Sequence, residues 1–136
     1  MSASRPDAVE RTFSIPGLPP APGPFAWTTA WGGLLFVSGL RGIDPATGAV
    51  APTDEERVAL IFEHLARALE AGGSSLRDVL QTRAYVTDMA RHRPLVNAAY
   101  ERAFGTDLPA RTIVEVRALN QDDTIEVEVV AARTRP

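Results

Sequence analysis

The segment Thr124–Val130 alternates apolar and acidic residues, and this alternation constrains the fold more than any other feature of the sequence. Successive side chains of a β-strand point to opposite faces of the sheet. One face of this strand therefore carries three apolar side chains, Ile125, Val127 and Val129. The other face carries Glu126 and Glu128. The pattern predicts a sheet with one face packed against a core and the other face left open.

Two amphipathic segments can supply that core. The first begins at Thr53, with Glu56 at the capping-box spacing, and ends at the glycine pair 72–73. Its apolar residues recur at helical spacing: Val58, Ile61, Phe62, Leu65 and Leu69. A second helix is predicted to begin near residues 91–93 and to stop at Gly105.

The remaining segments complete a mixed sheet. Four of them have the β-branched and aromatic content of strands: residues 25–30, 34–38, 79–86 and 111–116. The proline-rich run Pro16–Pro24 excludes a helix or an inner strand and predicts a fixed loop. The order is ββαβαββ, an α+β fold with a mixed β-sheet covered on one face by two helices. We expect a single domain over residues 1–136, with residues 1–15 as a flexible N-terminus.

The composition narrows the possible functions. The chain has no cysteine, so disulfides, thiolate nucleophiles and zinc–thiolate sites are excluded. Its 14 basic and 17 acidic residues give a formal net charge of −3. This charge disfavours nucleic-acid binding, because a surface that follows phosphates needs a basic excess. No stretch is long and apolar enough to cross a membrane, and the first residues lack the apolar core of a signal peptide, so we expect a cytoplasmic protein.

Metal and cofactor sites find no support in the sequence. His64 lies off the apolar stripe of the first predicted helix, and His92 lies at the start of the second. We interpret both as surface histidines, since neither has a partner ligand at a metal-binding spacing. Nucleophile elbows, Walker loops and dinucleotide-binding glycine patterns do not occur. We therefore expect no metal and no cofactor.

Charged residues within strands are the remaining candidates for a site. Arg111 begins a strand, where its side chain can reach the rim of the sheet, and Glu126 interrupts an otherwise apolar strand. These groups could simply face water on the open side of the sheet. Alternatively, the guanidinium of Arg111 could bind a ligand carboxylate through two hydrogen bonds, while a neighbouring carboxylate orients or deprotonates a water molecule. The pattern alone leaves both interpretations open.

An ordered set of motifs favours the second interpretation. The motifs are Leu35–Gly39 before Asp44–Gly48, then Ala71–Val79, then Tyr85–Met89 with Val96–Tyr100, and finally Pro109–Thr112 leading to Val114–Val116 and Ile125–Glu128. Together they cover roughly residues 20–132. The chain resembles the Rid family of reactive-intermediate deaminases, also called the YjgF family and historically labelled L-PSP endoribonuclease.

The resemblance implies a chorismate-mutase-like (YjgF-like) fold that assembles as a homotrimer with clefts between subunits. It also implies hydrolysis of reactive enamines and imines, such as 2-aminoacrylate and 2-imino acids, to a 2-keto acid and ammonia. In the family pattern, Arg111 matches the arginine that binds the substrate carboxylate. Glu126 matches the glutamate that holds the attacking water together with a main-chain carbonyl, here that of Ile113. Ser38 and Gly39 match residues that line the cleft.

The sequence departs from the family pattern around the expected cleft. Leu40, Arg41 and Gly42 stand where the family has glutamine, a small apolar residue and proline. Phe25 keeps the ring of the usual tyrosine and loses its hydroxyl. These changes make the cleft wall more apolar and add a cation, so we include Phe25, Leu40 and Arg41 among the substrate-binding residues. They favour a larger imine or enamine as substrate, although Arg41 could instead be an exposed turn residue.

Two other functions compete with imine hydrolysis. The altered loop at residues 40–42 would also suit a non-catalytic trimer that senses a small carboxylate metabolite. The older family label suggests RNA cleavage, but the acidic net charge and the lack of a histidine pair argue against it. Asn97 matches a helix residue of the family pattern, which we interpret as structural.

Overall fold

The computed structural model describes residues 8–135 as six strands, two α-helices and two short 3-10 helices. The strands are β1 (Glu10–Thr12), β2 (Thr28–Trp31), β3 (Leu34–Arg41), β4 (Val79–Val86), β5 (Ala110–Glu115) and β6 (Ile125–Ala132). The helices are α1 (Asp54–Ala71), η1 (Leu76–Asp78), α2 (Met89–Phe104) and η2 (Asn120–Asp122).

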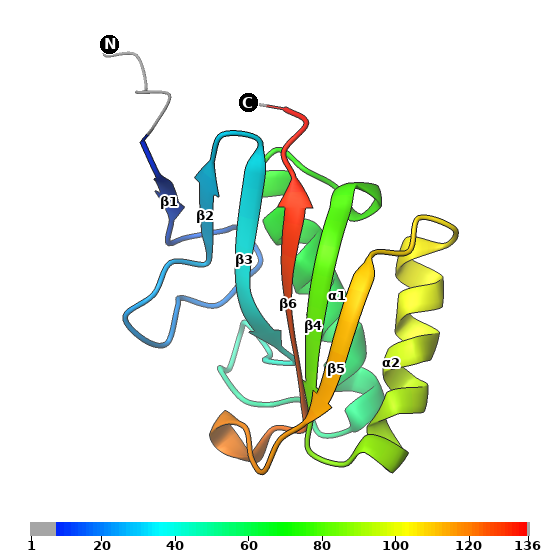
Figure 1. The fold of residues 1–136 in the computed structure, drawn as a ribbon. Coiled ribbons are helices and arrows are strands. Elements are labelled where there is room, and N and C mark those ends of the chain that lie inside the picture. The colour runs from blue at the N-terminus through cyan, green and yellow to red at the C-terminus, as the bar shows by residue number, and fades with distance from the viewer. Residues whose placement is uncertain (1–7, 136) are drawn as a thin grey trace.

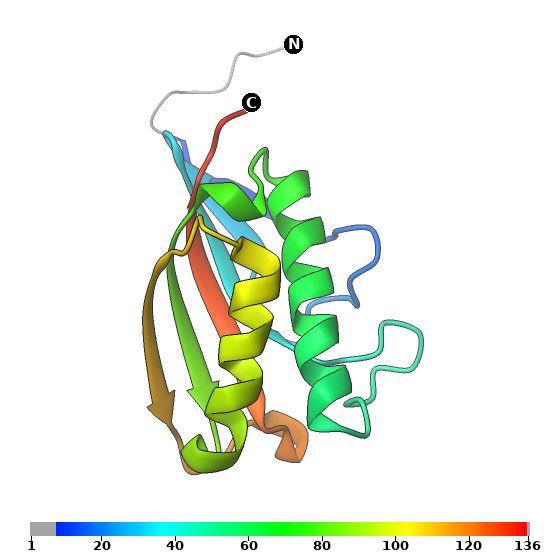
Figure 2. The same ribbon diagram turned by 90° about the vertical axis from the view of Figure 1, so that its right-hand side faces the viewer.

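The strands form one twisted sheet in the order β1-β2-β3-β6-β4-β5 (Figure 1). The β4–β5 pair is parallel and the other pairs are antiparallel, which confirms the predicted mixed sheet. Both α-helices lie on the same face, as Figure 2 shows from the side. The apolar face of β6 is buried beneath them, and Ile125, Val127 and Val129 are each at most 3% exposed. The acidic face of β6 points away from the helices.

Both α-helices begin at side-chain caps. Thr53 accepts a hydrogen bond from the Glu56 amide, as its spacing predicts. The second helix begins at Met89, two residues before the predicted range, because Asp88 accepts from the Arg91 amide. Gly105 ends this helix with a φ of 59°, a conformation that favours glycine.

The N-terminal prediction needs a correction. Residues 10–12 form β1, which pairs with β2 at the sheet's edge, so the expectation of a flexible segment up to residue 15 is wrong there. Ile15 is also buried in the core, at 4% exposure. Periodicity missed β1 because three residues are too few to show an alternation. The part of that expectation concerning residues 1–7 lies outside the described residues.

Two strands of unequal length create the space for a site. Thr28, the first residue of β2, pairs with Val37, whereas β3 continues to Arg41. The last residues of β3 therefore extend beyond β2, and the β3–β6 register shifts between Val37 and Leu40. The proline-rich loop runs past this exposed end of the strand. Because proline supplies no amide hydrogen, the loop covers the strand end without adding a regular strand to it.

Candidate active site

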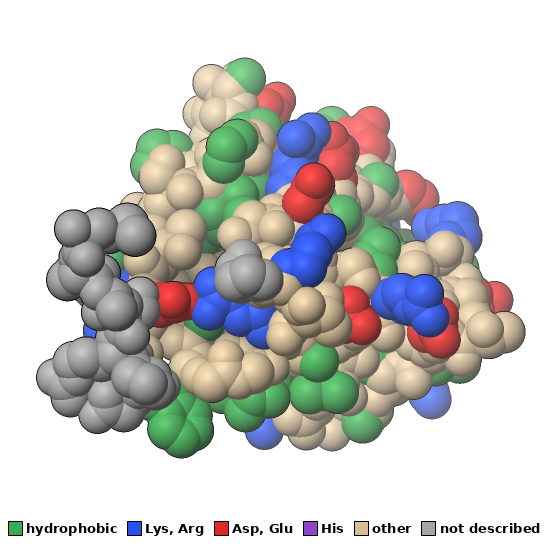
Figure 3. Space-filling view, turned by 90° about the horizontal axis from the view of Figure 1, so that it is seen from above, with side chains coloured by type: hydrophobic (Ala, Val, Ile, Leu, Met, Phe, Trp, Pro, Cys, Tyr) green, Lys and Arg blue, Asp and Glu red, His purple; other side chains and the backbone are tan. Residues whose placement is uncertain are grey.

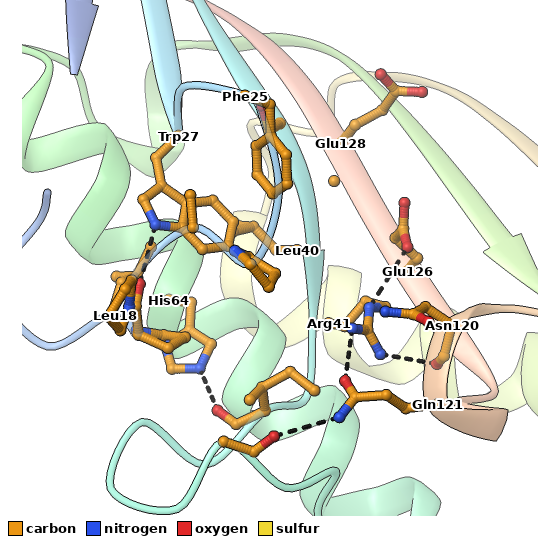
Figure 4. A pocket seen from close by; sticks show the side chains of 18 residues that line it. Leu18, Phe25, Trp27, Leu40, Arg41, His64, Asn120, Gln121, Glu126 and Glu128 are labelled. Carbon is orange, nitrogen blue, oxygen red and sulfur yellow. Dashed lines mark hydrogen bonds and ion pairs between the residues drawn. The ribbon is translucent and has the colours of Figure 1, made fainter. Parts of the chain in front are cut away.

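A cavity of about 900 Å³ lies where β3 extends beyond β2 (Figure 4). Six of the eight predicted site residues line it: Phe25, Ser38, Gly39, Leu40, Arg41 and Glu126. They come from the proline-rich loop, from β3 and from β6, three segments that are far apart in the sequence. The structure therefore brings most of the predicted cleft together within a single chain.

One wall of the cavity is apolar. Phe25 packs edge-on against Trp27, with ring centroids 5.4 Å apart. The Trp27 indole N–H donates to the Pro19 carbonyl at 3.0 Å, which ties the proline-rich loop to the start of β2. The Ser38 hydroxyl donates to the Ala26 carbonyl at 2.7 Å. The hydroxyl of Ser38 thus already has an acceptor within the protein, and it helps to hold the two segments together.

The opposite wall carries Glu126, and Gly39 makes room for it. A Cβ atom at Gly39 would lie 2.2 Å from Glu126 Oε2, far closer than ordinary contact. Glycine is therefore required at residue 39 for close approach to the carboxylate, even though its φ lies outside the left-handed region. The Glu126 side chain is 28% exposed, so it is largely enclosed but reachable from the cavity.

The surroundings of Glu126 act on its acidity in opposite directions. Burial raises the pKa of Glu126 above the ordinary value of 4.5, because a desolvated carboxylate is disfavoured. The charges of Asp123 and Glu128 raise the pKa further, and the nearby charge of Arg41 lowers it. A carboxylate with a raised pKa accepts a proton more readily, which suits a general base.

Arg41 lies inside this wall. The alternative expectation, that Arg41 is an exposed turn residue, is therefore wrong. Its side chain is 9% exposed, and Nη1 lies 3.1 Å from Asp123 Oδ2. Its Nε lies 3.8 Å from Glu126 Oε1. Sequence patterning could not decide this point, because it gave no sign that Asp123 would be buried beside the end of β3.

Arg111 and Ile113 lie elsewhere in the chain. Both are on β5, which is separated from β6 by β4. The Arg111 side chain points to the helix-covered face, where Nη1 donates to Asn97 Oδ1 at 2.8 Å and the guanidinium carbon lies 4.9 Å from the Tyr100 ring centre. Glu126 points to the other face. A single chain therefore does not bring Arg111 and Glu126 together, and Asn97 holds Arg111 in place.

The interpretation of both histidines as surface residues is wrong. His64 is 3% exposed and lines the cavity, with Nε2 against the Ile43 carbonyl at 2.8 Å. Because a carbonyl only accepts, Nε2 carries the proton, and the buried Nδ1 has no partner among the described residues. The sequence pattern placed His64 off the apolar stripe, but His64 lies three residues after Ile61 and four before Ala68, and this helical spacing was the signal that could have found it.

His92 belongs to a buried network at the start of both helices. Its Nδ1 accepts from the Asp88 amide, so Nε2 donates to Asp54 Oδ2 at 3.2 Å. Asp54 also accepts from Thr124 Oγ1 at 2.7 Å. Burial opposes ionisation of Asp54, but the hydrogen bonds from Thr124 and His92 and the charge of Arg91 outweigh it and lower the pKa of this carboxyl.

The described residues contain no group of three or more side chains suited to hold a metal ion. Within the same part of the chain, no helix is both long and apolar enough to span a membrane.

Comparison with known proteins identifies the family. Residues 18–133 match the sequence profile of the family described as Endoribonuclease L-PSP. The chain belongs to this family. It is 33% identical to the 2-iminobutanoate/2-iminopropanoate deaminase of Salmonella typhimurium over 92% of this chain and 99% of that protein. A protein named as a deaminase thus aligns with this chain along nearly its whole length.

Solved structures of this family share the fold. The YjgF gene product of E. coli superposes with a TM-score of 0.83 at 30% identity, covering 91% of this chain and 99% of that one. The E. coli protein TdcF, solved with bound serine, gives a TM-score of 0.84 at 25% identity, covering 92% and 100%. The predicted YjgF-like α+β fold is therefore confirmed.

Proposed function

We propose that this protein hydrolyses 2-imino acids and their enamine tautomers to 2-keto acids and ammonia. The observation that carries the proposal is the carboxylate of Glu126, which faces a largely apolar cavity with its pKa raised by burial. The named activity of the Salmonella relative supports the same reaction class. A small amino acid bound to TdcF supports a ligand with a carboxylate and a nitrogen on adjacent carbons.

The chemistry needs a positioned water and little else. A protonated imine carbon is already electrophilic, so placing water beside it supplies much of the rate enhancement. Glu126 accepts a proton as the water oxygen bonds to the C=N carbon, which gives a tetrahedral carbinolamine. Proton transfer to nitrogen then lets the C–N bond break, releasing ammonia as the carbonyl forms. The main-chain carbonyl of Ile113 is the proposed second acceptor for the water.

Two copies of the chain would complete the site. Arg111 is the proposed carboxylate-binding residue, but it lies on a different strand and a different face from Glu126. The open face of the sheet carries large exposed apolar side chains: Leu34, Phe36 and Val114. Such a face favours burial against other subunits. We therefore propose a homotrimer whose clefts combine Glu126 of one subunit with Arg111 of the next, to be tested by light scattering on the purified protein.

The cavity walls support a substrate larger than 2-iminopropanoate. Phe25, Trp27 and Leu40 offer an apolar surface, and the cavity of about 900 Å³ exceeds what a three-carbon acid fills. We propose that the carbon chain of the substrate packs on this surface. We also propose that the protein is cytoplasmic, which is consistent with a chain that lacks cysteine.

Nucleic-acid cleavage receives no comparable support. On the face shown in Figure 3, basic side chains of the described residues lie beside acidic ones. A phosphate-tracking surface would instead gather basic side chains along one stripe. The family description names an endoribonuclease, but the cavity of this chain is lined by one arginine and two glutamates.

The test is a coupled assay of keto acid and ammonia released from enzymatically generated 2-imino acids of increasing chain length. Glu126→Gln keeps the shape of the side chain and removes the base, so we expect a loss of about 10²–10⁴-fold in kcat. Arg111→Ala should raise KM. Glu101→Gln, at an exposed position of α2, is the matched control. Wild-type protein that binds imino or keto acids tightly without turnover would replace this proposal with the metabolite-sensing trimer.

A further inference from the structure

Arg41 is held in the cavity wall by three acceptors from one short segment. Its Nη1 donates to the Asn120 carbonyl at 2.9 Å and to Asp123 Oδ2 at 3.1 Å, and its Nη2 donates to Gln121 Oε1 at 2.9 Å. The Asp123 side chain is fully buried. A planar guanidinium bound to several acceptors has little freedom to swing into the cavity. The arginine therefore has a fixed position.

The turn that supplies these acceptors has an unfavourable backbone conformation. Gln121 and Asp122 have φ values of 59° and 56°, and neither is glycine. Side chains with a Cβ atom rarely adopt this conformation, so surrounding contacts must maintain it. Arg41 supplies two such contacts, and the Gln121 amide donates a third to the Gly48 carbonyl at 3.4 Å. The hydrogen bonds of the Arg41 guanidinium thus help to maintain the backbone conformation of the η2 turn.

The remaining edge of the guanidinium faces Glu126. These two residues are direct partners in the β3–β6 register, and Nε lies 3.8 Å from Glu126 Oε1. That distance is an ion pair and not a hydrogen bond, so the carboxylate keeps its acceptor sites free for another molecule. Arg41 therefore attracts the Glu126 carboxylate electrostatically and leaves its hydrogen-bond acceptor sites free.

The two other charged groups that shift the pKa of Glu126, Asp123 and Glu128, both raise it. Arg83 of β4 lies on the same face of the sheet, but its register partner is Glu128 and not Glu126. Glu128 lies on the same face of β6, and Asp123 lies beneath Arg41. Tyr85 of β4 is the register partner of Glu126 on the other side and hydrogen-bonds to Glu128, which raises the pKa of Tyr85 and keeps it neutral. Among the described residues that line the cavity, Arg41 is the single cation.

We propose that Arg41 is a positioning residue, clamped by Asp123 and the η2 turn, that keeps Glu126 in the cavity as a carboxylate. This inference rests on the proposed function for its catalytic meaning. The electrostatic effect of Arg41 on the Glu126 carboxylate can be measured whatever reaction the protein catalyses.

The direct test is a carboxyl NMR titration of Glu126 in the wild type and in variants at residue 41. Arg41→Met should move the Glu126 midpoint to higher pH, and Arg41→Lys should restore most of the difference, because it keeps the charge. Arg102→Met removes an exposed arginine from the last turn of α2 and should leave the midpoint unchanged. An unchanged midpoint in folded Arg41→Met would overturn the proposal.

Arg41→Met removes the nearer of the two cations that pair with the buried carboxylate of Asp123 and could prevent folding. The double variant Arg41→Met/Asp123→Leu removes both charges and avoids that problem. Its Glu126 midpoint should still rise, because Arg41 acts on Glu126 more strongly than Asp123 does. A midpoint at or below that of the wild type would count against the inference.

The activity assay separates positioning from substrate binding. If Arg41 acts only through Glu126, the acid limb of kcat/KM moves to higher pH in Arg41→Met, with a loss of about tenfold at the acid end and little change on the plateau. A KM that rises at every pH would instead show that Arg41 binds substrate, and would overturn the proposal. A wild type without imine hydrolysis would refute the proposed function alone, since the titration would still report on Arg41.

Discussion

Gly39→Ala is the smallest change that should disable the site while leaving the fold intact. A Cβ atom built at residue 39 lies 2.2 Å from Glu126 Oε2 and 2.8 Å from its Cδ. Ordinary contact begins at 3.4 Å, so the carboxyl group must withdraw by at least an ångström. Because these atoms belong to the flexible end of the Glu126 side chain, the glutamate moves and the backbone stays.

The energies favour an effect on activity over an effect on stability. Replacing glycine by alanine where φ is not left-handed stabilises a protein by about 0.4–1 kcal/mol through the unfolded state. Pushing Glu126 off its preferred rotamer costs about 0.5–1.5 kcal/mol. These contributions nearly cancel, so the melting temperature should change little. A displacement of about an ångström at a catalytic group can lower the rate by about 10²-fold.

The assay is hydrolysis of 2-iminopropanoate, with thermal unfolding measured on the same samples. The matched control is Gly33→Ala, because a Cβ atom there meets nothing within 4 Å and φ is not left-handed. We expect Gly33→Ala to retain full activity and Gly39→Ala to lose about 100-fold in kcat/KM. Full activity in Gly39→Ala would refute the reasoning that Glu126 must occupy its observed position.

Two further changes test the surroundings of the site. Asn97→Ala removes the acceptor that holds Arg111, and we expect KM to rise several-fold with a smaller change in kcat, measured in the same assay. Asp54→Asn removes a carboxylate whose pKa is lowered in the folded state, and we expect about 2 kcal/mol less stability at pH 7. A lowered pKa stabilises the fold above the ordinary carboxyl value of 3.8, and this contribution disappears as the pH falls through the folded-state pKa. In urea unfolding, the gap between the wild type and Asp54→Asn should therefore begin to narrow near about pH 4 and close only below the folded-state pKa of Asp54. A gap that stays constant as the pH falls through this range would contradict the assignment.

Local patterns predicted the elements of the fold well, because each has a signal within a few residues. Thr53 and Glu56 form the expected cap, the glycine pair 72–73 ends the first helix, and β4 has the predicted bounds. The strands 34–38 and 124–130 were predicted too short, at the ends where β3 reaches Arg41 and β6 reaches Ala132. Their extra residues are ordered by neighbouring strands and not by local propensity.

The site was predictable only in part. The resemblance of the motifs to the family pattern identified the residues around Gly39 and Glu126 as candidates, and the structure places them in one cavity. Trp27 and His64 were missed, because a buried aromatic residue and a helical histidine look the same whether they line a cavity or a core. The separation of Arg111 from Glu126 depends on strand order, since β4 inserts between β5 and β6. A sequence pattern does not encode that order locally.

Each buried charge at the cavity is paired with an opposite charge, and the series starts at Gly39, which has no side chain. Gly39 admits Glu126 into a partly desolvated position, where burial alone would favour the neutral acid. Arg41 opposes that tendency, but an arginine at 9% exposure itself needs acceptors. Asp123 supplies one and is fully buried in turn, with Arg57 Nε 3.9 Å from its other oxygen. Each buried charge is therefore satisfied by the next. Asp123 does not line the cavity, but a substitution there should still affect Glu126. Breaking the Asp123–Arg41 pair leaves the charge of Arg41 uncompensated beside the Glu126 carboxylate.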